Sequence, residues 1–426
     1  MDKNKEFVDE FIGTVAYTIS GEQTLPYAGA KKTLIGMLFL NAITNSPELA
    51  SVDNKNDYAT MLTFARKIFG SGAYDEEILE KTLNLLEKKY DLPAGILEAE
   101  SLKRHLDDHL ISLRESFNMN ELPSDIDYVS ALKDLIARPQ DNKDTVNTYL
   151  YYTNESLQQL AAGILKVKNN ETFMDCCCGM FSSALYNDAA NYIGVELDKE
   201  MAGIAAMILI MAKKKFSIKH ENFLNHKDEN VADKILADIP SGTGTPQTES
   251  RPYGKNTEAY CIENVVKALK DGGKAVVVCF GSILSKQDSS KKLREALTKD
   301  HLQAVVSLPP MCIGTKSNTN LIILQKNCHA KEIKFINASN LEIKNQNRMT
   351  LNESDILDII RCLNGDKAKC FFKDIPIEDI LSSDSISWIP NNYVKSKETS
   401  KGRTIQEIDK DLKESYKELE ELFLSK

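Results

Sequence analysis

Polar side chains follow four predicted strands at the points where those strands end. They are Asp175 and Gly179 in the turn Asp175-Cys176-Cys177-Cys178-Gly179, Glu196, the pair Asn222-Phe223, and the run Asp238-Ile239-Pro240-Ser241. Open α/β sheets bind ligands at the carboxyl ends of their strands. A glycine turn lets the backbone approach a ligand closely, and an acid about 20 residues later hydrogen-bonds a ribose. The four segments therefore predict a purine-nucleoside pocket with a reactive loop beside it.

Each of these segments also has a plainer explanation. An acid ends many strand–helix–strand units without any ligand, Asn222 equally fits a turn residue, and Asp238 fits the start of a turn before a proline. The spacing G-x-G-x-x-G is absent, which disfavours a dinucleotide oxidoreductase. Neighbouring side chains on a strand point to opposite faces, so the three consecutive cysteines cannot close a tetrahedral zinc site alone. We predict no metal site.

The elements that must position these residues begin near residue 145, where the pattern becomes alternating strand and helix. We predict strands at 171–174, 192–195, 215–219, 234–237, 274–280, 303–307, 320–325 and 333–336. Helices are expected between most of them, including one after the Gly179 turn. This alternation predicts an α/β fold with a parallel sheet covered by helices on both faces. The strands 303–307 and 320–325 are joined by a loop without helical signal and are predicted to be antiparallel.

Helical regions are predicted before and after the sheet-forming segment of the sequence. In residues 1–140 apolar residues recur at spacings of three and four, as in the run from Leu34 to Leu40, and the polar segment 139–145 is typical of a linker. A looser segment is expected at about 340–400. A final helix starts at Thr404, which forms a capping box with Glu407, and its narrow apolar stripe suits a helix–helix seam. The predicted domains are 1–140, 145–340 and 341–426.

Composition narrows the class of protein. The 426 residues are 42% hydrophobic and 27% charged, which is typical of a globular protein of two or three domains. No apolar run approaches the roughly 18 residues of a membrane span, and the charged N-terminus is unlike a secretory signal. Nine cysteines without a repeating spacing favour the reducing cytoplasm. A chain that held nucleic acid alone would usually be basic, so the net charge of −9 favours a partner that holds it.

Over roughly residues 145–395 the chain resembles the N6-adenine DNA methyltransferases, specifically the modification (M) subunit of type I restriction–modification systems. The segment Tyr151-Tyr152-Thr153-Asn154 is similar to the family's TP segment, and the turn from Asp175 to Gly179 stands where the family has DPACGTG. Glu196 stands at the family's ribose-binding acid, Asn222-Phe223 near its adenine-reading acid, and Asp238-Ile239-Pro240-Ser241 at its NPPF or NPPY motif. The segments 272–278, 308–310, 335–339 and 388–394 follow the family order.

This resemblance implies a Rossmann-like methyltransferase domain that uses S-adenosylmethionine (SAM), with a helical N-terminal domain and a C-terminal helix. It implies cofactor contacts by Thr153, Asp175, Gly179, Glu196, Asn222 and Phe223. The catalytic segment would be Asp238-Ile239-Pro240-Ser241, whose Asp238 side chain and Ile239 carbonyl accept hydrogen bonds from the amino group of a flipped adenine. The expected partners are a DNA specificity subunit, a restriction subunit, and double-stranded DNA held through the complex. The final helix is expected to dock on the specificity subunit.

The chain departs from the family's motifs at several positions around this one site. Ile239 replaces the first proline and Ser241 the aromatic residue of NPPF, while Asn154 replaces the proline of TP. Phe181 puts a side chain where a glycine normally allows close backbone approach. Stacking on an aromatic side chain is worth about 1–3 kcal/mol per base, so its loss predicts reduced activity. A catalytically inactive scaffold of the same fold and an RNA or protein N-methyltransferase are the alternatives.

Overall fold

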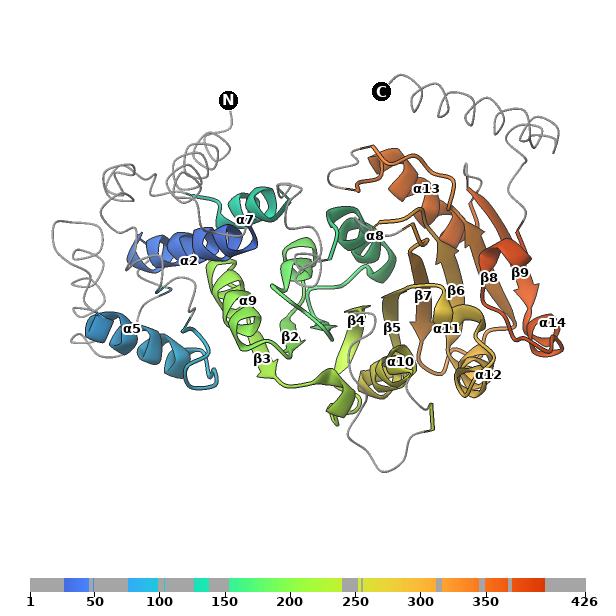
Figure 1. The fold of residues 1–426 in the computed structure, drawn as a ribbon, viewed down its shortest axis with the longest axis horizontal. Helices are drawn as coiled ribbons and strands as arrows, with labels where there is room; N and C mark the ends of the chain where they lie inside the picture. The colour runs from blue at the N-terminus through green and yellow to red at the C-terminus, as the bar shows by residue number, and fades with distance from the viewer. Residues whose placement is uncertain are drawn as a thin grey trace, which may run out of the picture.

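The computed structural model describes residues 27–45, 49, 76–98, 103, 126–137, 153–239, 252–253, 256–311, 316–344, 349–366 and 370–394. Its centre is a nine-stranded sheet in the order β3-β2-β1-β4-β5-β7-β6-β8-β9 (Figure 1). The strands are β1 (Thr172–Asp175), β2 (Asn191–Glu196), β3 (Phe216–His220), β4 (Ala232–Asp238), β5 (Leu269–Cys279), β6 (Leu302–Ser307), β7 (Asn320–Gln325), β8 (Glu332–Asn337) and β9 (Phe371–Pro376).

Helices surround this sheet (Figure 1). They are α2 (Tyr27–Asn45), α5 (Glu76–Lys89), α7 (Tyr128–Ala137), α8 (Glu155–Leu165), α9 (Lys199–Met211), α10 (Thr257–Ala268), α11 (Ser282–Ser285), α12 (Ser290–Asp300), α13 (Glu353–Asn364) and α14 (Ile377–Leu381). Short 3₁₀ turns are η5 (Ser182–Tyr186), η6 (Phe223–Asn225) and η7 (Pro390–Asn392). None of the helices in the described part of the chain is both long and apolar enough to cross a membrane.

The predicted strands correspond to β1 through β8 in order. Strands β1 to β5 pair in parallel, and β7 is antiparallel to both β5 and β6, which confirms the antiparallel prediction. Strand β1 lies between β2 and β4, so strands β2 and β3 extend the sheet on one side of β1 and β4 and β5 extend it on the other. Such a switch point is where an open α/β sheet forms its ligand crevice. Asp175, Glu196 and Asp238 end these three strands.

Two sequence expectations were wrong. The segment after Gly179 forms the five-residue turn η5 rather than an α-helix, because the left-handed Phe181 precedes it and the extended Asn187 ends it. The segment expected to be loose contains α13, β9 and α14. Strand β9 is an edge strand with mostly exposed side chains, so it carries no alternation of apolar and polar residues that would reveal it.

Two apolar cores lie on opposite faces of the sheet, and alternate residues of a strand point into one or the other. On β5, Val276 and Val278 face the core shared with α8, α9 and α13, while Ala275 and Val277 face the core shared with α10, α11 and α12. This alternation follows from the period of two in a strand, and it makes the molecule a three-layer structure.

Helix α9 is buried on all sides because a second set of helices covers it. Every residue from Met201 to Met211 is buried, and α2 packs along the helix. A Cβ atom at Gly203 would lie 2.1 Å from the Ile96 carbonyl oxygen, so glycine is required where the N-terminal region meets α9. The N-terminal helices thus complete the core on one face of the sheet, at the end that carries β2 and β3 (Figure 1).

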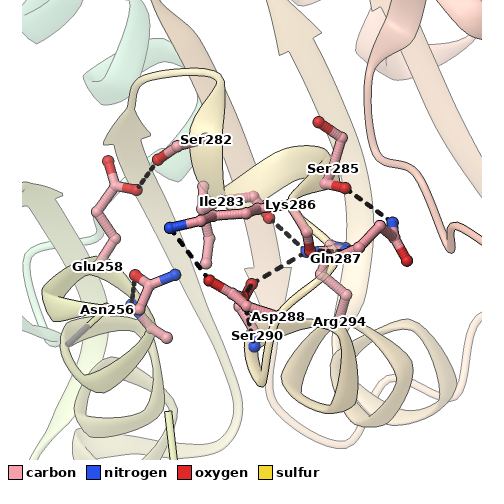
Figure 2. A network of polar contacts seen from close by, with 11 residues as sticks. Asn256, Glu258, Ser282, Ile283, Ser285, Lys286, Gln287, Asp288, Ser290 and Arg294 are labelled. Atoms are coloured by element: carbon pink, nitrogen blue, oxygen red, sulfur yellow. Dashed lines mark hydrogen bonds and ion pairs between the residues drawn. The ribbon is translucent and has the colours of Figure 1, made fainter. Parts of the chain in front are cut away.

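A buried arginine on α12 holds the segment 383–394, which follows α14, against α11 and α12. Arg294 is fully buried, and its guanidinium donates to the carbonyl oxygens of Ile386 at 2.9 Å and Ile283 at 3.0 Å. It also donates to the carbonyl oxygen of Lys286 at 2.9 Å (Figure 2). Nearby, the fully buried Trp388 donates from Nε1 to Thr298 Oγ1 at 2.9 Å. Together these contacts join α11, α12 and the segment after α14.

Replacing Arg294 with methionine is expected to lower the free energy of unfolding by about 2–3 kcal/mol. Methionine fills much of the same volume, but the buried carbonyl oxygens that Arg294 bonds would lose their donor. Urea unfolding measures the change. The control is Arg361→Met on α13, whose side chain is 58% exposed and should change stability by less than about 0.5 kcal/mol. Equal unfolding midpoints for R294M and the wild type would contradict the fastening role.

Candidate functional site

The glycine turn and the acid of β2 contact each other directly. Gly179 adopts a φ of 50°, in the left-handed region that glycine tolerates, and its N–H donates to Glu196 Oε2 at 2.7 Å. The N–H of Asp198 donates to Glu196 Oε1 at 2.8 Å. Burial raises the pKa of Glu196, and these backbone donors partly oppose the rise. Because each carboxylate oxygen has two lone pairs, a fixed Glu196 retains acceptor sites for a vicinal diol.

Asp175 is a buried carboxyl group with one unused oxygen. It is 3% exposed, and its Oδ2 accepts a hydrogen bond of 2.5 Å from Ser183 Oγ. Its Oδ1 is buried without a hydrogen-bond partner among the described residues. Burial raises the pKa of Asp175 to about 7, and the neighbouring negative charges of Asp238 and Glu196 add to the rise. A positively charged donor group would relieve both the repulsion and the missing hydrogen bond.

Asp238 ends β4 beside Asp175, and Thr153 reaches it from the segment before α8. The side chain of Thr153 donates a hydrogen bond to Asp238. Burial raises the pKa of Asp238 to about 6, and this hydrogen bond opposes the rise. The structure therefore brings together Thr153, Asp175 and Asp238, which lie far apart in the sequence.

Ile239 continues the strand after Asp238. Its N–H donates to the Val278 carbonyl oxygen at 3.3 Å, and its side chain is 2% exposed in the core shared with α10. Ile239, which stands at the first proline of the motif that this segment resembles, is thus a core residue with a paired N–H, which proline could not provide. Pro240 and Ser241 lie outside the described residues, as does the predicted helix from Thr404.

Asn222 and Phe223 have clear structural contacts. Asn222 Oδ1 accepts from the Leu224 N–H at 3.0 Å and caps η6, which agrees with a turn residue. Phe223 is 4% exposed, stacks on His226 with ring centroids 5.2 Å apart, and its carbonyl accepts from Asn264. Their predicted part in cofactor binding stays a prediction.

Phe181 keeps its ring away from the glycine turn. It adopts a left-handed φ of 54°, which costs about 1–3 kcal/mol for a residue with a side chain. The ring is fully buried and packs against Phe173 and Tyr192, at centroid distances of 6.1 and 6.4 Å. The turn therefore keeps a glycine-like backbone while the Phe181 side chain fills the core.

Sequence reasoning missed Gln158 and Leu197. Gln158 is 2% exposed, and its Nε2 donates to the Thr153 carbonyl and to Ser182 Oγ, the latter at 2.7 Å. Its Oε1 is buried without a partner among the described residues. Leu197 is 61% exposed directly after Glu196. The sequence offered one signal for each residue: Gln158 is a polar residue on the apolar face of α8, and Leu197 is an apolar residue between two acids.

Comparisons with known proteins identify the relatives of this chain. The sequence model of the family described as N-6 DNA Methylase matches residues 141–402. The type I restriction enzyme MpnII methylase subunit of Mycoplasma pneumoniae is 27% identical over 148 residues, which are 34% of this chain and 27% of that protein. The match thus spans about a quarter of the length of that relative.

Solved structures of two type I restriction–modification proteins share the fold. A methyltransferase subunit from Streptococcus thermophilus superimposes with a TM-score of 0.70 at 16% identity, covering 92% of this chain and 100% of that one. A modification subunit of a putative type I restriction enzyme from Vibrio vulnificus gives 0.57 at 12% identity, covering 90% and 95%. Because the family model matches more than half of the sequence, this chain belongs to the N-6 DNA methylase family.

Proposed function

We propose that this chain is the modification subunit of a type I restriction–modification system, which transfers a methyl group from SAM to N6 of a flipped adenine. The observation that carries the proposal is the cluster of three carboxyl groups at the switch point, where backbone amides fix Glu196 and the negative charges of Asp238 and Glu196 act on Asp175. A positively charged ligand with a ribose suits this acidic cluster. The family membership and the shared fold support the same reaction.

The chain's own residues fit the parts of SAM. Glu196 would accept hydrogen bonds from the ribose hydroxyls, and the exposed Leu197 offers an apolar surface to the purine. The unpartnered Oδ1 of Asp175 and Oε1 of Gln158 would accept N–H groups of an ammonium ion. Bound SAM would supply a methyl group on a positively charged sulfur.

Asp238 would act on the target base. Its carboxylate would accept a hydrogen bond from the adenine amino group, would raise the electron density on the nitrogen that receives the methyl group, and would be placed to take the proton that this nitrogen gives up. Thr153 holds Asp238 in place, and the role of the protein is mainly positioning and charge placement. The replacement of the stacking aromatic by Ser241 supports a reduced activity of the chain alone.

A specificity subunit and a restriction subunit are the proposed partners. The net charge of −9 supports a partner that holds the DNA, because the phosphate backbone attracts basic surfaces. A further solved structure shares the fold with a TM-score of 0.65 at 13% identity, and it comes from work on complex assembly of a type I restriction–modification system.

Calorimetric titration of the full chain with SAM is expected to show binding, and Glu196→Gln should weaken it by about 10- to 100-fold. That loss corresponds to a charged hydrogen bond of about 1.5–3 kcal/mol. The matched control is Glu332→Gln, a change of the same kind at the exposed start of β8, which should leave the affinity unchanged. An absence of heat at millimolar SAM, on a folded wild-type sample, would rule out the enzyme and favour the inactive scaffold.

A further inference from the structure

The segment 349–366 holds the first turn of α8, although about 195 residues of sequence separate them. Asn154, the N-cap of α8, donates from Nδ2 to the Met349 carbonyl oxygen at 3.1 Å. The N–H of Leu351 donates to Ser156 Oγ at 3.0 Å, and Ser156 is 2% exposed. Both contacts are local to the start of α8, where the chain leaves Thr153.

The two helices also meet closely further along. A Cβ atom at Gly163 would lie 2.4 Å from Cδ1 of Ile360, so the α13 side chain occupies the space above that glycine. Helix α13 buries Ile356 and Ile359 in the same core as α8. Helix α13 therefore packs on α8 at Gly163, while the residues just before α13 bond Asn154 and Ser156 at the N-terminal end of α8.

The same turn of α8 orients Thr153. The Gln158 side chain donates to the Thr153 carbonyl, and the Thr153 side chain donates to Asp238. One hydrogen bond links Gln158 of α8 to Thr153, and a second links Thr153 to Asp238. A displacement of the α8 N-terminus would therefore move the hydroxyl of Thr153 relative to Asp238. Among the residues that the structure describes, Asp175 on β1 and Cys279 on β5 are titratable groups whose pKa values respond to the charge of Asp238.

We infer that Ser156 is a positioning residue, which uses the segment 349–366 to hold Thr153 against Asp238. The expected effect of Ser156 on methyl transfer rests on the proposed function. The expected effect of Ser156 on the contact between Thr153 and Asp238 is independent of the proposed function. The C-terminal part of the fold thereby becomes part of the apparatus that orients the reactive carboxyl group.

The titration of Asp238 in the ligand-free protein provides a test that needs no activity. With carbon-13-labelled aspartate, the Asp238 carboxyl resonance is assigned from its loss in Asp238→Asn. Ser156→Ala should raise the pKa of Asp238, because a weakened Thr153 hydrogen bond stabilises the carboxylate less. Ser156→Thr, which keeps the hydroxyl, should restore the wild-type titration. Ser156→Cys, which retains a weak acceptor in a similar volume, serves if the alanine variant does not fold.

Turnover gives the second readout. Ser156→Ala should lower kcat by about tenfold, the equivalent of about 1.4 kcal/mol, with a smaller change in KM for SAM. The control is Gln159→Ala on the same helix, whose side chain bonds Glu155 on its own helix rather than the segment 349–351. An Asp238 titration that is the same in Ser156→Ala and the wild type overturns the inference, even if the melting temperature falls. A shifted titration in a protein that binds no SAM would support the positioning role and refute the proposed function.

Discussion

Asp238→Ala is expected to lower methyl transfer to DNA by about 100- to 1,000-fold, the usual cost of removing one preorganised group that stabilises developing charge. The alanine side chain offers no oxygen to the adenine amino group, and it also leaves the Thr153 hydroxyl without its acceptor. The measurement is the rate of methyl transfer from labelled SAM in the presence of the specificity subunit. Unchanged transfer by Asp238→Ala would show that the proposed role of Asp238 is wrong.

Asp238→Asn is the matched control, because asparagine keeps an acceptor oxygen and is the residue of the NPPF motif that this segment resembles. The wild-type rate should fall as the pH drops through about 6, where Asp238 becomes protonated and loses acceptor strength. Asp238→Asn should retain activity without that fall. Burial also raises the pKa values of Asp175 and Glu196, so these neighbouring carboxyl groups account for any remaining pH dependence in the variant.

Asp175→Asn is expected to stabilise the ligand-free protein at pH 8 by about 4 kcal/mol at most, while weakening SAM binding. The pKa of Asp175 rises from 3.8 to about 7 on folding, and each pKa unit corresponds to about 1.36 kcal/mol. Asparagine removes the buried charge and still accepts the hydrogen bond from Ser183. The contribution is shared with Asp238, because the two carboxyl groups repel each other.

The pH dependence of this effect has a definite sign. Between pH 4 and pH 7 the folded state binds more protons than the unfolded state at Asp175, so the wild type loses stability as the pH rises through that window. Asp175→Asn should therefore match the wild type near pH 4 and exceed it increasingly up to pH 7. Urea unfolding at pH 5 and pH 8 measures the difference, with Asp188→Asn, whose side chain is 84% exposed, as the control. A variant less stable than the wild type at pH 8 would contradict the assignment.

The predictable part of the site lies where local pattern determines structure. The strands before Asp175, Glu196 and Asp238 are short apolar runs, and their order along the chain suffices to place three carboxyl groups on one edge of a sheet. The antiparallel pairing of β6 and β7 was also predictable, because the loop between these two strands has no helical signal. Neighbouring residues carry this information, because the period of a strand or helix is a property of a few consecutive side chains.

The tertiary structure alone decided how those carboxyl groups are surrounded. Burial raises the pKa of Asp175 to about 7, and burial depends on layers contributed by distant segments. The contact of Ser156 with Leu351 joins residues 195 positions apart, and the burial of α9 depends on α2, which precedes the sheet by more than 100 residues. Such contacts cannot be read from sequence periodicity, since the sequence around either partner does not indicate which distant residue it will contact. The sequence by itself determined which three carboxyl groups end β1, β2 and β4, and only the packing of distant elements determined their protonation and their alignment.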